Sequence, residues 1–217
     1  MNFIDKFVQK HRNFGIKNLM MHVSILTMIV FVVNMLSNGR LIPFLYLNRN
    51  LAIGNMQIWR LVTFLFIPET TSIFWILFSV YLYYILGTAL ENVMGTCRFT
   101  LYYVTCALAT IIAALIFGGV YTGTYVNMSI FLVFAYYYPN FMINLFFIFP
   151  VEVKYIAFFD IIVLAISLIR ALLWFDFATV LAILAPFVGI FLFFGPTMLD
   201  SFKAYKRRRD FQRKMRD

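Results

Sequence analysis

Residues 99–138 read FTLYYVTCALATIIAALIF, then GGVYTG, then TYVNMSIFLVFAYYY. They belong to a run over 99–151 that holds no charged residue. This run is too long for one membrane crossing, because about 20 residues span a bilayer as a helix. The glycines in GGVYTG interrupt it, so we predict one span over about 99–117 and a shorter one over about 125–138. Pro139 ends the shorter span, since the residue before a proline avoids the helical region.

The composition of the whole chain is that of a membrane protein. Of its 217 residues, 63% are hydrophobic and 12% are charged. Soluble domains have about 45–50% apolar and about 25% charged residues. The mean hydropathy of +0.87 excludes an ordinary soluble enzyme and a disordered protein. The length allows six spans with short loops, so we predict an all-α membrane protein folded as a six-transmembrane-helix bundle.

The other apolar runs predict four more spans. They cover about 19–37, a run that starts after Pro68 and ends near Leu90, about 155–169 and about 177–194. The connection over 38–57 is too polar to cross the membrane and too apolar to float free, so we expect it to lie in the interface. On the other side of the bilayer, we expect residues 140–154 to form an apolar loop.

Basic residues gather at the two ends of the chain and account for its net charge of +9. Segments 1–18 and 198–217 are basic, and they flank the membrane domain over 19–197. Because positively charged segments stay in the cytoplasm, we predict that both termini are cytoplasmic. We expect them to contact anionic lipid headgroups. We expect no nucleic-acid partner, because no recognisable binding fold accompanies the charge.

Few residues offer the chemistry of an enzyme. The two histidines, His11 and His22, lie near the start of the first span. No clustered metal ligands and no phosphate-binding loop occur, so we expect neither a metal nor a cofactor. Asp160 lies inside the fifth span, where a charge is expensive. It either bonds to polar groups of the bundle, contacts a client helix or moves a proton.

Several motifs occur in an order that resembles the rhomboid superfamily over nearly the whole chain. They are Gly87, Glu91 and Gly95 as G-x-x-x-E-x-x-x-G, the pair Trp59-Arg60, the run from Arg98 to Tyr103, and Tyr138-Pro139-Asn140. The resemblance implies a six-helix bundle with a short fourth helix and a lateral opening near the second and fifth spans. It also implies structural roles. The glutamate ties loop backbone at the membrane face, and the Trp-Arg pair lies in a membrane-embedded first loop.

Rhomboid proteases need a G-x-S-G serine in the fourth span, a histidine in the sixth and a His-x-x-x-Asn pair in the second. The matching positions here are Ser129, about Ile183, and the pair Trp75 and Ser79. Both glycines beside the serine are replaced, and no histidine follows His22. A serine without a base is a weak nucleophile at neutral pH. We therefore expect no catalytic residue in this chain.

The resemblance and the missing base together imply a rhomboid pseudoprotease, similar to the Derlins. We expect it to bind transmembrane segments of client proteins without cleaving them, as a chaperone, adaptor or membrane quality-control factor. The expected client-binding residues are Trp75, Ser79, Asn127 and Ser129, although helix packing alone equally explains small and polar residues there. Two alternatives stay open: a small-molecule or ion carrier, and a rhomboid protease with residual activity. The composition favours a bacterial plasma membrane over the endoplasmic reticulum.

Overall fold

The computed structural model describes residues 14–145 and 149–195, together with Val8 and Lys10. The basic tail over 198–217 and most of segment 1–18 therefore lie outside the described residues. The described elements are α2 (Leu19–Leu36), η1 (Ile42–Phe44), β1 (Leu47–Asn48), η2 (Asn50–Gly54), α3 (Arg60–Thr63), η3 (Phe64–Phe66), α4 (Ile73–Met94), α5 (Thr96–Phe117), β2 (Val120–Tyr121), α6 (Thr124–Tyr137), β3 (Met142–Leu145), β4 (Phe149–Glu152), α7 (Val153–Leu173) and α8 (Phe177–Leu184).

Five described helices are long and apolar enough to cross a membrane: α2, α4, α5, α7 and the segment Phe177–Gly195. The helix α6 is apolar but has only 14 residues. The prediction of an all-α membrane bundle is therefore confirmed. The last span is not continuous. Its first part, α8, ends at Leu184, a turn covers 185–186, and the helix resumes over 187–195, because Pro186 has no N–H for the helical ladder.

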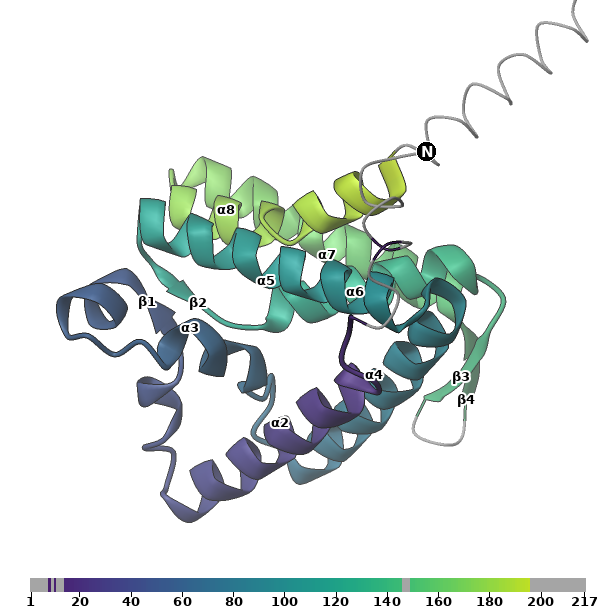
Figure 1. The fold of residues 1–217 in the computed structure, drawn as a ribbon, viewed down its shortest axis with the longest axis horizontal. Coiled ribbons are helices and arrows are strands. Elements are labelled where there is room, and N and C mark those ends of the chain that lie inside the picture. Colours follow the sequence, from purple (N-terminus) through teal and green to yellow (C-terminus); the bar gives the residue numbers. More distant parts are fainter. Residues whose placement is uncertain (1–7, 9, 11–13, 146–148, 196–217) are drawn as a thin grey trace, which may run out of the picture.

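The helices pack in pairs around α6 (Figure 1). The longest contact runs along α2 and α4, while α5 packs against α8 and α6 packs against α4, α5 and α7. The core lies where these elements meet. Its largest fully buried side chains include Phe64, Leu86, Phe99, Tyr102 and Phe134.

The connection between α2 and α4 is fixed to the bundle rather than free. Its strand β1 pairs antiparallel with β2, with Leu47 opposite Tyr121. Farther along, the amide of Gly123 donates to the carbonyl of Phe64 at 2.9 Å. Phe44, Ile53 and Met56 expose more than half of their surface, which suits a segment lying in the membrane interface. This loop occupies one end of the molecule (Figure 1).

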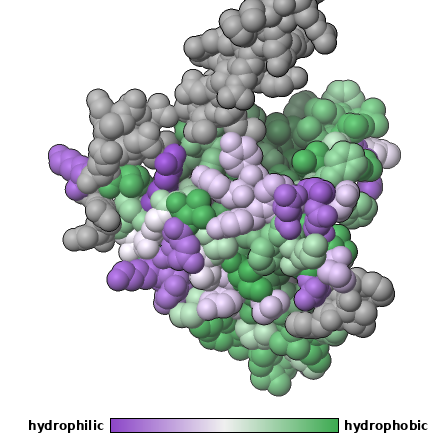
Figure 2. Space-filling view, turned by 90° about the vertical axis from the view of Figure 1, so that its right-hand side faces the viewer, coloured by the Kyte–Doolittle hydropathy of each residue, from purple (hydrophilic) through white to green (hydrophobic). Residues whose placement is uncertain are grey.

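The opposite end carries a β-hairpin where the sequence predicted a loop over 140–154 (Figure 1). Strands β3 and β4 pair antiparallel, from Met142 opposite Glu152 to Leu145 opposite Phe149. The hairpin pairs backbone groups that an apolar loop would leave unsatisfied at the membrane face. Hydrophilic residues gather at this end of the molecule (Figure 2).

Candidate functional site

The G-x-x-x-E-x-x-x-G motif forms a corner that joins α2, α4 and α5. A Cβ added to Gly87 would lie 2.2 Å from Cβ of Met20, so the glycine lets α2 approach α4 closely. The Glu91 carboxylate accepts bonds from the Asn18 amide at 3.1 Å and the Thr96 hydroxyl at 2.8 Å. Gly95 connects α4 to α5 with a φ of +83°, which glycine adopts at no steric cost. The motif has the geometry of a structural joint.

Arg60 holds together the loop between α2 and α4. It is 2% exposed, and its Nη1 donates to the carbonyls of Pro43 and Tyr46, both at 2.9 Å. Its Nε donates to the Gln57 amide oxygen at 2.6 Å. The neighbouring Trp59 is half exposed and donates through Nε1 to the carbonyl of Phe44. Both side chains bind loop backbone, which is the arrangement of a structural clamp.

Ser129 is enclosed in the contact between α6 and α5. It has no exposed surface. Its hydroxyl donates to the carbonyl of Val126 at 2.7 Å and accepts from the Tyr102 hydroxyl at 3.1 Å. Cys106 Sγ lies 3.8 Å from the same oxygen. The described histidine, His22, lies instead on α2 and contacts the carbonyl of Asn18. Among the described residues, therefore, no base contacts Ser129, and its side chain has no exposed surface.

The four residues predicted to bind clients do not converge. Trp75 is 46% exposed on α4 and packs edge-on against Phe74 and Phe78. Ser79 donates to the carbonyl of Trp75 within its own helix. Asn127 is buried, but it faces a different set of partners from Ser129. Ile183, the approximate position of the missing histidine, is buried in α8.

Asn127 belongs to a polar cluster that the sequence did not predict as a unit. Its amide nitrogen donates to Glu69 Oε1 at 3.4 Å, and the Tyr83 hydroxyl donates to the same oxygen at 2.7 Å. Glu69 comes from the segment between η3 and α4, which turns into the bundle after the buried Ile67. An acid next to a proline between two apolar runs was the only signal in the sequence.

Asp160 lies on the buried stripe of α7, which includes Val153, Ala157 and Leu164. The helix α7 packs against α6, which carries Asn127, and one carboxylate oxygen of Asp160 is buried. We call Glu69, Tyr83, Asn127 and Asp160 the polar cluster. It draws on the loop, α4, α6 and α7.

Two buried oxygens of the polar cluster have no hydrogen-bond partner among the described residues. They are Oδ1 of Asn127 and Oδ2 of Asp160. The hydroxyl of Tyr103 on α5 is likewise buried without a partner in the described part of the chain. Buried polar atoms are normally paired. Within the described part of the chain, no group of three or more His, Cys, Asp or Glu residues is placed to hold a metal ion.

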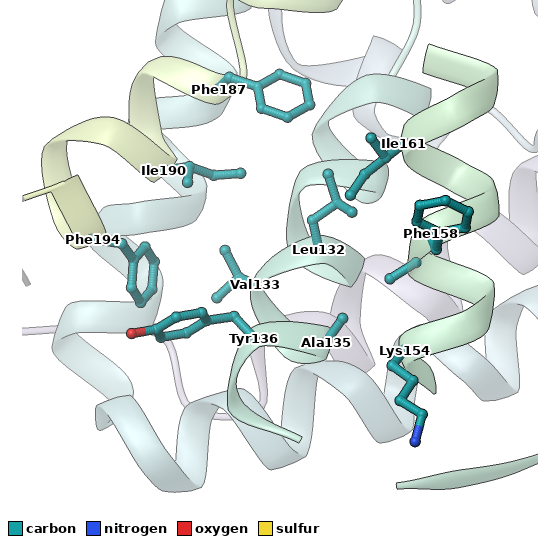
Figure 3. A pocket seen from close by; sticks show the side chains of 11 residues that line it. Leu132, Val133, Ala135, Tyr136, Lys154, Phe158, Ile161, Phe187, Ile190 and Phe194 are labelled. Atoms are coloured by element: carbon teal, nitrogen blue, oxygen red, sulfur yellow. The ribbon is translucent and has the colours of Figure 1, made fainter. Parts of the chain in front are cut away.

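A separate groove opens between α6, α7 and the helix over 187–195 (Figure 3). Its volume is about 470 Å³. The lining side chains come from all three helices and are apolar except at Tyr136 and Lys154. Lys154 is itself paired with Glu152. Such a lining suits a hydrocarbon chain better than a polar substrate.

Comparison with known proteins gives one match. A family model described as Rhomboid domain matches residues 55–196, which is more than half of the chain. The matched region starts in the loop between α2 and α4 and includes the corner at Glu91, Ser129 and the whole polar cluster. No curated protein and no solved structure matches the chain.

Proposed function

Since the chain belongs to the rhomboid family, we propose that it is a pseudoprotease that binds transmembrane segments of client proteins without cleaving them. Binding without cleavage suits a chaperone, an adaptor or a membrane quality-control factor, as in the Derlins.

The environment of Ser129 carries the proposal. A serine nucleophile needs an adjacent base to take its proton. The Ser129 hydroxyl instead donates to a carbonyl of its own helix, and the sequence contains no histidine after residue 22. An acyl-transfer site also needs room for a tetrahedral intermediate beside the nucleophile, whereas Ser129 has no exposed surface.

The exposure of α4 and α7 supports a role in binding helices. These two have the smallest buried fractions among the five long helices. Each packs on α6, and the polar cluster lies where they approach it. Large apolar side chains such as Leu77 on α4 and Phe159 on α7 are exposed. A client helix has apolar surface to pack against there and polar groups to bond.

Three measurements on the reconstituted full chain test this proposal. A serine-reactive fluorophosphonate should not label it, and a single-span peptide should stay intact when incubated with it in lipid nanodiscs. A photocrosslinker at Ser79, one turn from Tyr83 on α4, should capture that peptide. The same crosslinker at the exposed Ile29 on α2 should capture far less. Labelling or cleavage that disappears in Ser129→Ala would establish a protease instead.

A carrier is the second candidate, because Asp160 is an acid inside a membrane span. Against it, the polar cluster ends at an apolar layer. Leu86 and Leu90 on α4 and Ile130 and Phe134 on α6 are fully buried between the cluster and the hairpin end. Ion or solute flux into proteoliposomes that is lost in Asp160→Asn would favour the carrier.

We also propose that both termini are cytoplasmic and that the membrane is a bacterial plasma membrane. The positive charge of the terminal segments supports the orientation. The chain's richness in Asn, Lys, Ile and Phe supports the bacterial source.

A further inference from the structure

We infer that the polar cluster selects client helices that carry a basic side chain within the membrane. The inference rests on the proposed function, since it names what the client contributes to the site between α4, α6 and α7.

Hydrogen-bond acceptors outnumber donors in the polar cluster. Glu69 Oε1 accepts two bonds, from Tyr83 and Asn127. Oδ1 of Asn127 and Oδ2 of Asp160 are buried and accept none from described residues. Because Asn127 is only 5% exposed, its unpartnered oxygen lies inside the protein and not at the surface. The site therefore has more acceptors than donors, and its missing group is a donor.

The carboxyl groups of the polar cluster have no basic partner among the described residues. The one ion pair recorded among the described residues joins Lys154 to Glu152, at the start of α7. No described Lys or Arg forms a salt bridge with Glu69 or Asp160. Glu69 lies against Asn127 on α6, α6 packs on α7, which carries Asp160, and ionised carboxylates that share a region of low dielectric constant repel each other. A cation placed between them would relieve this repulsion and supply the missing donors together, which a neutral hydroxyl would not do.

The polar cluster lies deep along the membrane helices. Tyr83 lies 11 residues before the end of α4, Asn127 lies 10 residues before the end of α6, and Asp160 lies 7 residues after the start of α7. At about 1.5 Å per residue, the cluster is roughly 10–17 Å from the hairpin end, near the middle of a hydrocarbon core of about 30 Å. A group reaching it sideways from the bilayer must come from another membrane-embedded molecule.

Access favours a client side chain over a free ion that crosses the membrane. Tyr83 and Asp160 are half-buried and Glu69 is exposed, so the cluster can be reached from the surface of the bundle. Toward the hairpin end it is closed by the buried Leu86 and Phe134. A lysine or arginine on a helix packed between α4 and α7 could extend its apolar stem along these helices and place its charge at the carboxylates.

The test uses the full chain in lipid nanodiscs and two single-span peptides of leucine and alanine, identical except for a central lysine or leucine. Binding is measured by energy transfer between labelled peptide and labelled protein. Wild type should bind the lysine peptide about tenfold more tightly than the leucine peptide, the effect of one or two polar contacts within the membrane. The double variant Glu69→Gln/Asp160→Asn should bind both peptides equally.

Asp176→Asn is the matched control, because Asp176 is an acid outside the cluster that caps α8 by accepting from the Thr179 amide. It should keep the tenfold preference. If the double variant does not fold, the single isosteric variants Glu69→Gln and Asp160→Asn each report a reduced preference.

Equal binding of both peptides to wild type would overturn the inference and leave client binding intact. A preference that survives both single variants would do the same. Binding of neither peptide would refute the proposed function and the inference with it. A cation flux that the double variant abolishes would assign the cluster to ion transport and overturn the inference as well.

Discussion

Glu91 shows how one carboxylate can fix the meeting point of three helices. It accepts the amide of Asn18 just before α2 and the hydroxyl of Thr96 at the start of α5. The bond from Thr96 is partly buried, so water competes less well for it than in bulk solution. These two bonds are the geometry of a residue that acts on folding, which is the role that the resemblance to the rhomboid superfamily implies for Glu91.

Replacing Glu91 by alanine should lower the free energy of unfolding by about 2 kcal/mol, since hydrogen bonds to charged groups contribute about 1.5–3 kcal/mol each. Thermal melting of the purified protein in detergent measures the effect. Asn92→Ala is the control, because Asn92 is the exposed neighbour on α4 and its side chain has no bond to described residues. Equal melting temperatures for the two variants would show that Glu91 does not stabilise the fold.

Arg60 is the second single residue on which the fold depends. Arg60→Ala should destabilise the protein by about 3 kcal/mol, because the carbonyls of Pro43 and Tyr46 lose a charged, buried donor. Arg60→Lys should recover only part of this loss, since one ammonium cannot reproduce the guanidinium fork. Arg40→Ala, at an exposed position in the same loop, should melt like wild type. A Lys variant as stable as wild type would show that charge alone matters there.

At the scale of elements, the contact between α2 and α4 depends on the absence of one side chain. Gly87→Ala would put a methyl group 2.2 Å from Cβ of Met20, and forcing a methyl group into a packed contact costs about 1–3 kcal/mol. Melting should show this loss, and Met20→Gly in the same chain should restore part of it, because glycine lacks the Cβ that the added methyl group would meet. Gly54→Ala should be neutral, because nothing lies within 4 Å of the added methyl group. A stable Gly87→Ala variant would mean that α2 and α4 can separate freely.

Hydropathy predicted the long helices well, because burial in lipid requires long apolar runs whose backbone is satisfied within the helix. Because the prediction relied on apolar content alone, it missed the β3–β4 hairpin. Its residues are nearly all apolar, and apolar content cannot distinguish a strand from a loop. The pairing of Ile143 with Val151 becomes visible only when the register is known.

The candidate site was only partly predictable. Asn127 and Ser129 are two residues apart on α6, so they point about 160° apart and cannot share one site facing the same direction. The helical spacing alone separates them, although both belong to the stretch that matches the protease motif. Glu69 is different. Its contact with Tyr83 brings a loop against the middle of a helix, and no local pattern encodes such a distant pairing.

At the scale of the molecule, the two ends differ in chemistry. At one end lies the loop between α2 and α4, which the β1–β2 pairing and the bonds of Arg60 hold in place. This loop has exposed apolar side chains such as Met56. The other end has the hairpin and the hydrophilic surface of Figure 2. Bilayers orient proteins by basic residues near the span ends, and Lys17 lies just before α2 while Arg98 and Lys154 lie near the starts of α5 and α7. All three belong to the hairpin end.

This asymmetry predicts the orientation of the whole chain. Single cysteines placed at Asn92 and at Glu152, on the hairpin end, should react with a membrane-impermeant thiol reagent only after intact cells are opened. Cysteines at Met56 and Trp174, on the loop end, should react in intact cells. The native Cys97 and Cys106 are buried, so replacing both by alanine or serine gives the background for the measurement. The physical reason is the cost of moving basic segments across the membrane, which acts on the segments nearest the spans. Labelling of position 152 in intact cells would show that the chain has the opposite orientation in the membrane.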